Sequence, residues 1–132
     1  MKARSRLVLV CMLGVILTQA GCEDEFTGPG AYVASVHVPE GGRAGAAVLE
    51  IEGRGIQSFG GLGDTRTYAP EANEPGGVHR LVLVGTGDRL AFEIRVDDMS
   101  RNPPRGVVIS AADTENQTLG VSGFSVAVRR GR

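Results

Sequence analysis

Two short polar segments of the sequence concentrate the side chains that bind calcium in proteins. Asp97 and Asp98 stand side by side in the first, and Asp113, Glu115 and Asn116 lie in the second. Calcium takes six to eight oxygen ligands, mostly from carboxylates, amides and carbonyls. The five residues therefore predict a calcium site, provided that the two segments are loops that meet at one end of the fold. Their spacing is not that of an EF-hand, and the alternative is that each group caps its own turn.

The other reactive side chains do not form a catalytic or zinc-binding set. The only histidines, His37 and His79, fall in segments with the pattern of strands, where we expect them to be exposed or at a sheet edge. Two histidines are fewer ligands than zinc needs. A Gly-x-Ser-x-Gly motif is absent, and the glycine-rich residues 60–64 lack the Gly-Lys-Ser/Thr of a phosphate loop. The sequence therefore predicts a protein that is not an enzyme and has no cofactor beyond the candidate calcium ion.

One cysteine, Cys22, stands at the end of a segment that has the order of a secretory signal. Three basic residues among the first six are followed by an uncharged apolar run at residues 7–17, and then by small or polar residues. The run is about half of the roughly 20 residues that a transmembrane helix needs. We therefore interpret residues 1–21 as a signal helix that is cleaved, not as a permanent membrane span.

The residues around the expected cleavage point resemble a bacterial lipoprotein signal. Ala20 and Gly21 precede Cys22, as small residues precede the lipidated cysteine in that family. Gln19 departs from the pattern, because the family has Leu or another aliphatic residue three positions before the cysteine. The resemblance implies a diacylglyceryl thioether on Cys22, and the Glu23 that follows implies a location in the outer membrane or at the cell surface. An ordinary secretory signal with a secreted product is the alternative.

The composition limits the remainder of the chain to one small domain. Removing 21 of the 132 residues leaves 111, and the three basic residues of the signal leave with it. Eleven Lys and Arg then stand against 15 Asp and Glu, a formal net charge of −4, which argues against a nucleic-acid partner. The 20 glycines and the absence of tryptophan are typical of a small all-β domain with tight turns.

The order of segments predicts a short tether followed by strands. Residues 22–30 are acidic and then rich in Gly and Pro, which indicates a tether, and residues 31–132 form the domain. Alternating apolar residues predict strands and no long helix. The predicted strands span residues 31–38, 47–52, 66–69, 78–84, 89–96, 107–112 and 120–129, and short strands or bulges share residues 53–77. About seven to nine strands at this spacing predict a two-sheet antiparallel β-sandwich, jelly-roll or immunoglobulin-like.

This order of segments resembles the cohesin and carbohydrate-binding-module class of sandwich domains. The most similar part runs from the apolar strand at residues 78–84 through the Gly-x-Gly of residues 85–87 to Leu90. The resemblance implies a domain that binds a protein or a polysaccharide and has no catalytic residues. Carbohydrate-binding members usually expose a row of Trp or Tyr, whereas only Tyr32 and Tyr68 are present here.

Two functions follow as expectations. The first is an exported, lipid-anchored, non-enzymatic binding or adhesion module that recognises a protein or a glycan. The second is a structural envelope lipoprotein that acts as an accessory subunit of a larger assembly. The surface distinguishes them, because an exposed apolar patch of several hundred Å² favours lasting assembly and a polar surface favours transient binding through loops.

Overall fold

The computed structural model of the chain describes residues 26–70, 77–86 and 89–132. The expected signal at residues 1–21 and the expected lipidation position, Cys22, lie outside the described residues. Within the described ranges, no helix is long and apolar enough to cross a membrane. The one helical element there is a single 3-10 turn, η1 (Pro39–Gly41).

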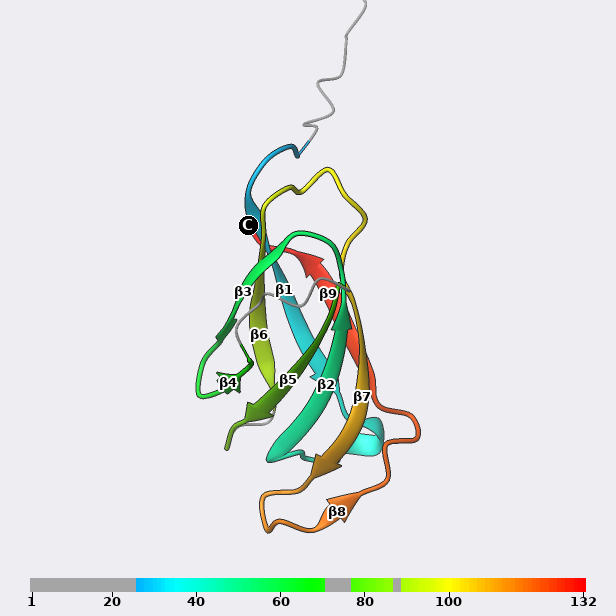
Figure 1. Cartoon of the computed structure of the whole chain (residues 1–132). Coiled ribbons are helices and arrows are strands. Elements are labelled where there is room, and N and C mark those ends of the chain that lie inside the picture. The colour runs from blue at the N-terminus through cyan, green and yellow to red at the C-terminus, as the bar shows by residue number, and fades with distance from the viewer. Residues whose placement is uncertain (1–25, 71–76, 87–88) are drawn as a thin grey trace, which may run out of the picture.

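Nine strands make up the described part of the fold. They are β1 (Gly30–His37), β2 (Ala46–Glu52), β3 (Ile56–Gly61), β4 (Arg66–Tyr68), β5 (Val78–Val84), β6 (Ala91–Val96), β7 (Arg105–Ala112), β8 (Thr118–Leu119) and β9 (Ser125–Arg130). They form a four-stranded sheet in the order β3-β6-β1-β9 and a five-stranded sheet in the order β4-β5-β2-β7-β8. Every pairing is antiparallel, and the two sheets lie against each other (Figure 1). The predicted two-sheet β-sandwich is confirmed.

Most connections pass from one sheet to the other. Only β4 with β5, and β7 with β8, are consecutive strands that pair, so the remaining connections cross the sandwich. Each crossing places successive apolar strand faces on opposite sides of one core. The core therefore forms from segments that are far apart in the sequence.

Alternation of side chains explains which residues enter the core. On each well-paired strand every second residue is buried, because successive side chains point to opposite faces of a sheet. The buried set is Tyr32, Ala34 and Val36 on β1, Ala47, Leu49 and Ile51 on β2, Leu81 and Leu83 on β5, and Phe92, Ile94 and Val96 on β6. The sequence alternation predicted these faces of β1, β2 and β6, and the structure confirms them.

The two histidines differ in their surroundings. His37 is exposed, as expected, but His79 is only 6% exposed, so the expectation for that residue is wrong. Its ring meets the ring of Phe59 edge to face at 5.7 Å, with an angle of 65° between the ring planes. The nearly continuous apolar run of β5 concealed its period of two. In the structure that period turns His79 inward with the two leucines, and it leaves Val78 and Val84 on the outer surface.

Two local features of the later strands also differ from the expectation. Gly123 falls inside the predicted strand at residues 120–129, where a glycine favours a bulge, but it lies in a turn, where the Phe124 N–H donates to the Val121 carbonyl at 3.1 Å. The bulge is on β7 instead. There Val48 pairs with Ser110 and the next residue of β2 pairs with Val108, so Ile109 has no partner across the ladder.

The sandwich has two distinct ends. The N-terminal end holds residues 26–29, the loops at 53–55 and 97–104, and the last residues of the chain after β9. The opposite end holds η1, the turn at 62–65 and the loop at 113–117 (Figure 1). Both termini of the described part therefore lie at one end.

Candidate functional site

The structure separates the five residues of the predicted calcium site into two groups. Asp97 and Asp98 lie in the loop before β7, and Asp113, Glu115 and Asn116 lie in the loop after it. A strand of this length spans about 24 Å at roughly 3.4 Å per residue, so the two loops lie at opposite ends of the sandwich. In the part of the chain that the structure describes, no group of three or more His, Cys, Asp or Glu side chains could hold a metal ion. The structure therefore does not bring these five residues together.

Asp97 and Asp98 instead fix the loop that follows β6. One carboxylate oxygen of Asp98 accepts hydrogen bonds from the Ser100 N–H at 2.9 Å and from the Gly28 N–H at 3.3 Å. The bond from Ser100, followed by smaller contributions from Gly28 and Arg101, holds the pKa of Asp98 below its ordinary value of 3.8. The Asp97 carboxylate accepts a bond from Arg101 at 3.0 Å.

The second acidic group caps its own turn, which was the alternative reading of these residues. Asp113 accepts two bonds on one carboxylate oxygen, from the N–H groups of Glu115 and Gln117, each at 2.8 Å. Asn116 adopts a φ of 62°, a left-handed conformation that Asn tolerates better than most residues. These contacts close the loop between β7 and β8.

The last residues of the predicted tether are attached to the sandwich. The Gly28 carbonyl accepts a hydrogen bond from the Met99 N–H at 2.7 Å. The guanidinium carbon of Arg130 lies 4.7 Å above the centre of the Phe26 ring, and Gly30 already begins β1. The described part of the segment therefore follows the domain closely, instead of extending freely from it.

The outer face of the five-stranded sheet carries an apolar band that the sequence analysis did not identify. Tyr68, Val84, Val107 and Ile109 are each between 42% and 57% exposed. The strand register joins them, since Tyr68 pairs with Val82 and Val82 pairs with Val48, and both valines are outward and partly exposed. We define the apolar band as Ala46, Val48, Tyr68, Val82, Val84, Val107 and Ile109.

A bulge on β7 changes which side chains lie on the outer face next to this band. Without it, strict alternation from the outward Val107 would leave Ile109 outward, Ser110 inward and Ala111 outward. The extra residue turns Ile109 and Ser110 outward together and returns Ala111 to the core, where it is 6% exposed. The period of two in the sequence cannot locate a bulge, and it does not state which strands are neighbours in a sheet, which is why the band could not be predicted.

Charged side chains border the apolar band on one side. Next to the band, Glu50 of β2 and Arg80 of β5 form an ion pair at 2.7 Å across the sheet. Beyond that pair, Glu52 lies opposite Arg105 in the register of β2 and β7. The face thus combines an aliphatic centre with a rim of both charges, which is the anatomy of a protein–protein interface.

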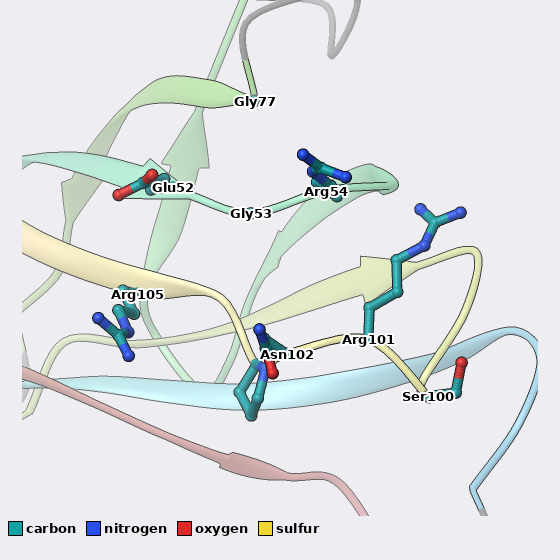
Figure 2. A pocket seen from close by; sticks show the side chains of 9 residues that line it. Glu52, Gly53, Arg54, Gly77, Ser100, Arg101, Asn102 and Arg105 are labelled. Carbon is teal, nitrogen blue, oxygen red and sulfur yellow. The ribbon is translucent and has the colours of Figure 1, made fainter.

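A shallow cleft of about 1040 Å³ lies at the N-terminal end of the sandwich (Figure 2). Its floor includes the backbone of Gly53 and Gly77, which are joined by a hydrogen bond of 2.8 Å from the Gly53 N–H to the Gly77 carbonyl. Arg54, Arg101 and Arg105 supply its basic groups, and Glu52, Ser100, Asn102 and Pro103 complete its wall. Such a cleft suits an anionic group better than an apolar ligand.

The glycine at position 55 lets the Arg101 side chain lie close to the backbone of the loop between β2 and β3. Gly55 has a φ of 69°, and a Cβ at that position would overlap the Asp97 carboxylate and the Arg101 guanidinium. The Gly55 carbonyl also accepts the Asp97 N–H at 2.9 Å. The loop between β2 and β3 therefore seats the Asp97–Arg101 pair at the edge of the cleft.

Comparisons of this chain with protein-family models, with curated proteins and with solved structures found no match.

Proposed function

We propose that this protein is an exported, lipid-anchored, non-enzymatic module that binds a protein partner through the apolar band of its five-stranded sheet. The anchor is the lipid expected on Cys22, and the location is the cell envelope, at the outer membrane or cell surface. The observation that carries the proposal is the exposed band itself, since apolar side chains on four adjacent strands, β4, β5, β2 and β7, form one continuous outer face.

The chemistry of the band favours a protein over a polysaccharide. Sugar-binding faces present aromatic rings that stack on sugars, and Tyr68 is the one aromatic residue of the apolar band. Valine and isoleucine side chains, by contrast, complement another apolar protein face. The partner we propose is an envelope protein with a flat apolar face whose charged rim complements Glu50, Arg80 and Arg105.

The same band also favours an accessory subunit over a transient adhesion module. A loop-based recognition site needs no apolar sheet face, whereas a permanent subunit covers one in its assembly. The function supported best is therefore that of an accessory lipoprotein within a larger envelope complex.

The experiment compares complex size after mild detergent extraction of envelopes that contain the full-length chain. Val107→Thr with Ile109→Thr removes apolar surface while keeping β-branched residues suited to a strand. We expect the wild-type protein to migrate in a complex well above its monomer mass, and the double variant to shift to the monomer position on native electrophoresis.

The matched control is Val33→Thr with Ala127→Ser, on the outward face of the four-stranded sheet. This variant should keep the wild-type complex. A wild-type protein that runs as a monomer would contradict the proposal. A species of dimer mass, lost with the same double variant, would identify a second copy of this chain as the occupant of the band.

The anchor has its own test. Intact mass and membrane partition are compared for the wild-type chain and for Cys22→Ser. We expect the wild type to carry added mass of diacylglyceryl size and to pellet with membranes, and the variant to be soluble after export. A wild-type protein that is cleaved, unlipidated and soluble would instead support a secreted module.

A further inference from the structure

The arginines of this protein are distributed unevenly along the sandwich. Eleven arginines fall in the described residues, and six of them lie at the N-terminal end. These six, which we call the arginine end, are Arg54, Arg95, Arg101, Arg105, Arg130 and Arg132, of which Arg95 is paired with Glu93 farther along β6. The opposite end has three arginines, Arg43, Arg66 and Arg89, and four carboxylates, Glu40, Asp64, Asp113 and Glu115.

Several cations of the arginine end face solvent without an ion-pair partner. Among the described residues three carboxylates share this end, Glu52, Asp97 and Asp98. Asp97 is committed to Arg101, and Asp98 accepts backbone N–H groups. No ion pair joins Arg54 or Arg105 to a carboxylate in the described ranges, and both line the cleft.

The chain itself brings this end close to the proposed anchor. Cys22 and Phe26 are separated by four Cα–Cα steps, which span at most about 14 Å. Gly28, two residues later, is already bonded to Met99 and Asp98. If Cys22 carries a lipid, Phe26 must therefore lie within about two Debye lengths of the headgroups at physiological ionic strength, and the Arg130 guanidinium lies over its ring at the same end of the sandwich.

We propose that the arginine end binds the phosphate groups of an anionic membrane surface and so fixes the orientation of the sandwich on the bilayer. The inference rests on the proposed lipid anchor and adds a second contact to it. Guanidinium groups bind phosphate through paired N–H donors, and Arg54, Arg101 and Arg105 all line the cleft (Figure 2).

A separate observation at the same end agrees with this assignment. Phe26 is half exposed although it is apolar, and its ring lies beneath the Arg130 guanidinium. An apolar ring beside a cation is the arrangement that peripheral proteins use at the boundary between headgroups and acyl chains. The apolar band lies on the side of the sandwich, so this orientation leaves it free for a protein partner.

The test uses the exported Cys22→Ser chain, which has no lipid and retains the acidic residues Glu23, Asp24 and Glu25. Its sedimentation is measured with vesicles of phosphatidylcholine alone and of phosphatidylcholine with phosphatidylglycerol. We expect binding only to the anionic vesicles, weakening as salt is added. Arg54→Gln with Arg105→Gln should lower the apparent affinity about 20–30-fold, at roughly fivefold per arginine.

The control removes two arginines from the opposite end, as Arg66→Gln with Arg89→Gln, and should leave the affinity within about twofold of the parent. Equal weakening by both double variants would overturn the inference, since only overall charge would then matter. An absence of binding to anionic vesicles would overturn it too, whatever the intact mass says about the anchor.

A third arm separates the membrane from a soluble source of the same chemistry. Glycerol 1-phosphate is titrated into the Cys22→Ser chain, and the arginine side-chain resonances are followed by NMR. We expect no saturation at millimolar concentrations, because a single phosphate lacks the dense array of a bilayer. Saturable binding that is lost in Arg54→Gln with Arg105→Gln would assign the cleft to a free phosphate ligand in place of the membrane.

Discussion

Asp98 shows how one carboxylate can join three parts of this chain. It lies after β6, caps the turn at Ser100, and accepts the N–H of Gly28 from the N-terminal segment. The sequence pattern could indicate that Asp97 and Asp98 have binding partners, but it could not identify those partners. Calcium ligation and turn capping use the same side chains, and the difference lies in whether two loops approach each other.

The lowered pKa of Asp98 predicts how the stability of the fold depends on pH. Its pKa in the folded protein is lower than the ordinary 3.8, so the stabilising contribution is present above that value and is lost as the pH falls through the lowered pKa. We expect Asp98→Asn to lower the urea midpoint at pH 7 and to converge with the wild type in strong acid.

The control for this prediction is Glu115→Gln, because the Glu115 side chain makes no hydrogen bond within the described residues. Urea unfolding followed by circular dichroism at pH 7 and near pH 2 measures both variants. An Asp98→Asn midpoint that stays below that of the wild type by the same amount at both pH values would show that the charge of Asp98 has no part in the effect.

Among the elements, β7 depends on a small residue where it faces the other sheet. Gly106 pairs with the buried Ile51 and faces the other sheet, where an added Cβ would lie 2.8 Å from Ile51 Cδ1 and 3.0 Å from Val126 Cγ1. The two sheets approach closely here because no side chain separates them. The sequence offered only a glycine before an apolar run, which is also the signal of a turn.

We therefore expect Gly106→Val to lower the free energy of unfolding by about 1–3 kcal/mol, the usual cost of overpacking a core. Gly60→Val is the matched control, since a Cβ at Gly60 of β3 would meet nothing within 4 Å. That substitution should change stability little or raise it slightly, because valine favours strands. Chemical denaturation of both variants tests the prediction, and equal losses would contradict it.

At the level of elements, sequence periodicity predicted the strands that bury one clean face. β1, β2 and β6 alternate strictly, so their inward sides could be assigned in advance. It failed where a strand is apolar on both faces, as in β5, and where an extra residue shifts the phase of the residues after it, as at Ser110 and Ala111 of β7. Both failures occur in the five-stranded sheet, and the first concealed part of its exposed outer face.

For the whole molecule, composition and strand spacing predicted the sandwich but not its sheet order. Only two of the eight connections join strands that pair, so the order depends on contacts between distant segments. The arginine end likewise depends on contacts between distant segments of the chain. Its residues come from the β2–β3 loop, the end of β6, the β6–β7 loop, the start of β7 and the chain end around and after the last residue of β9, and only the folded chain brings them together. The tests of the apolar band and of membrane binding address these two surfaces separately.

The position of β1 also determines how the protein would carry mechanical force. β1 lies between β6 and β9 and pairs with each over six residues. If the chain is held at Cys22, a pull on a bound partner reaches the domain along the axis of β1, and it loads both rows of hydrogen bonds in shear rather than one bond at a time. The contacts of Phe26 and Gly28 would break first. The tether would then become longer by a few residues while the sandwich stays folded.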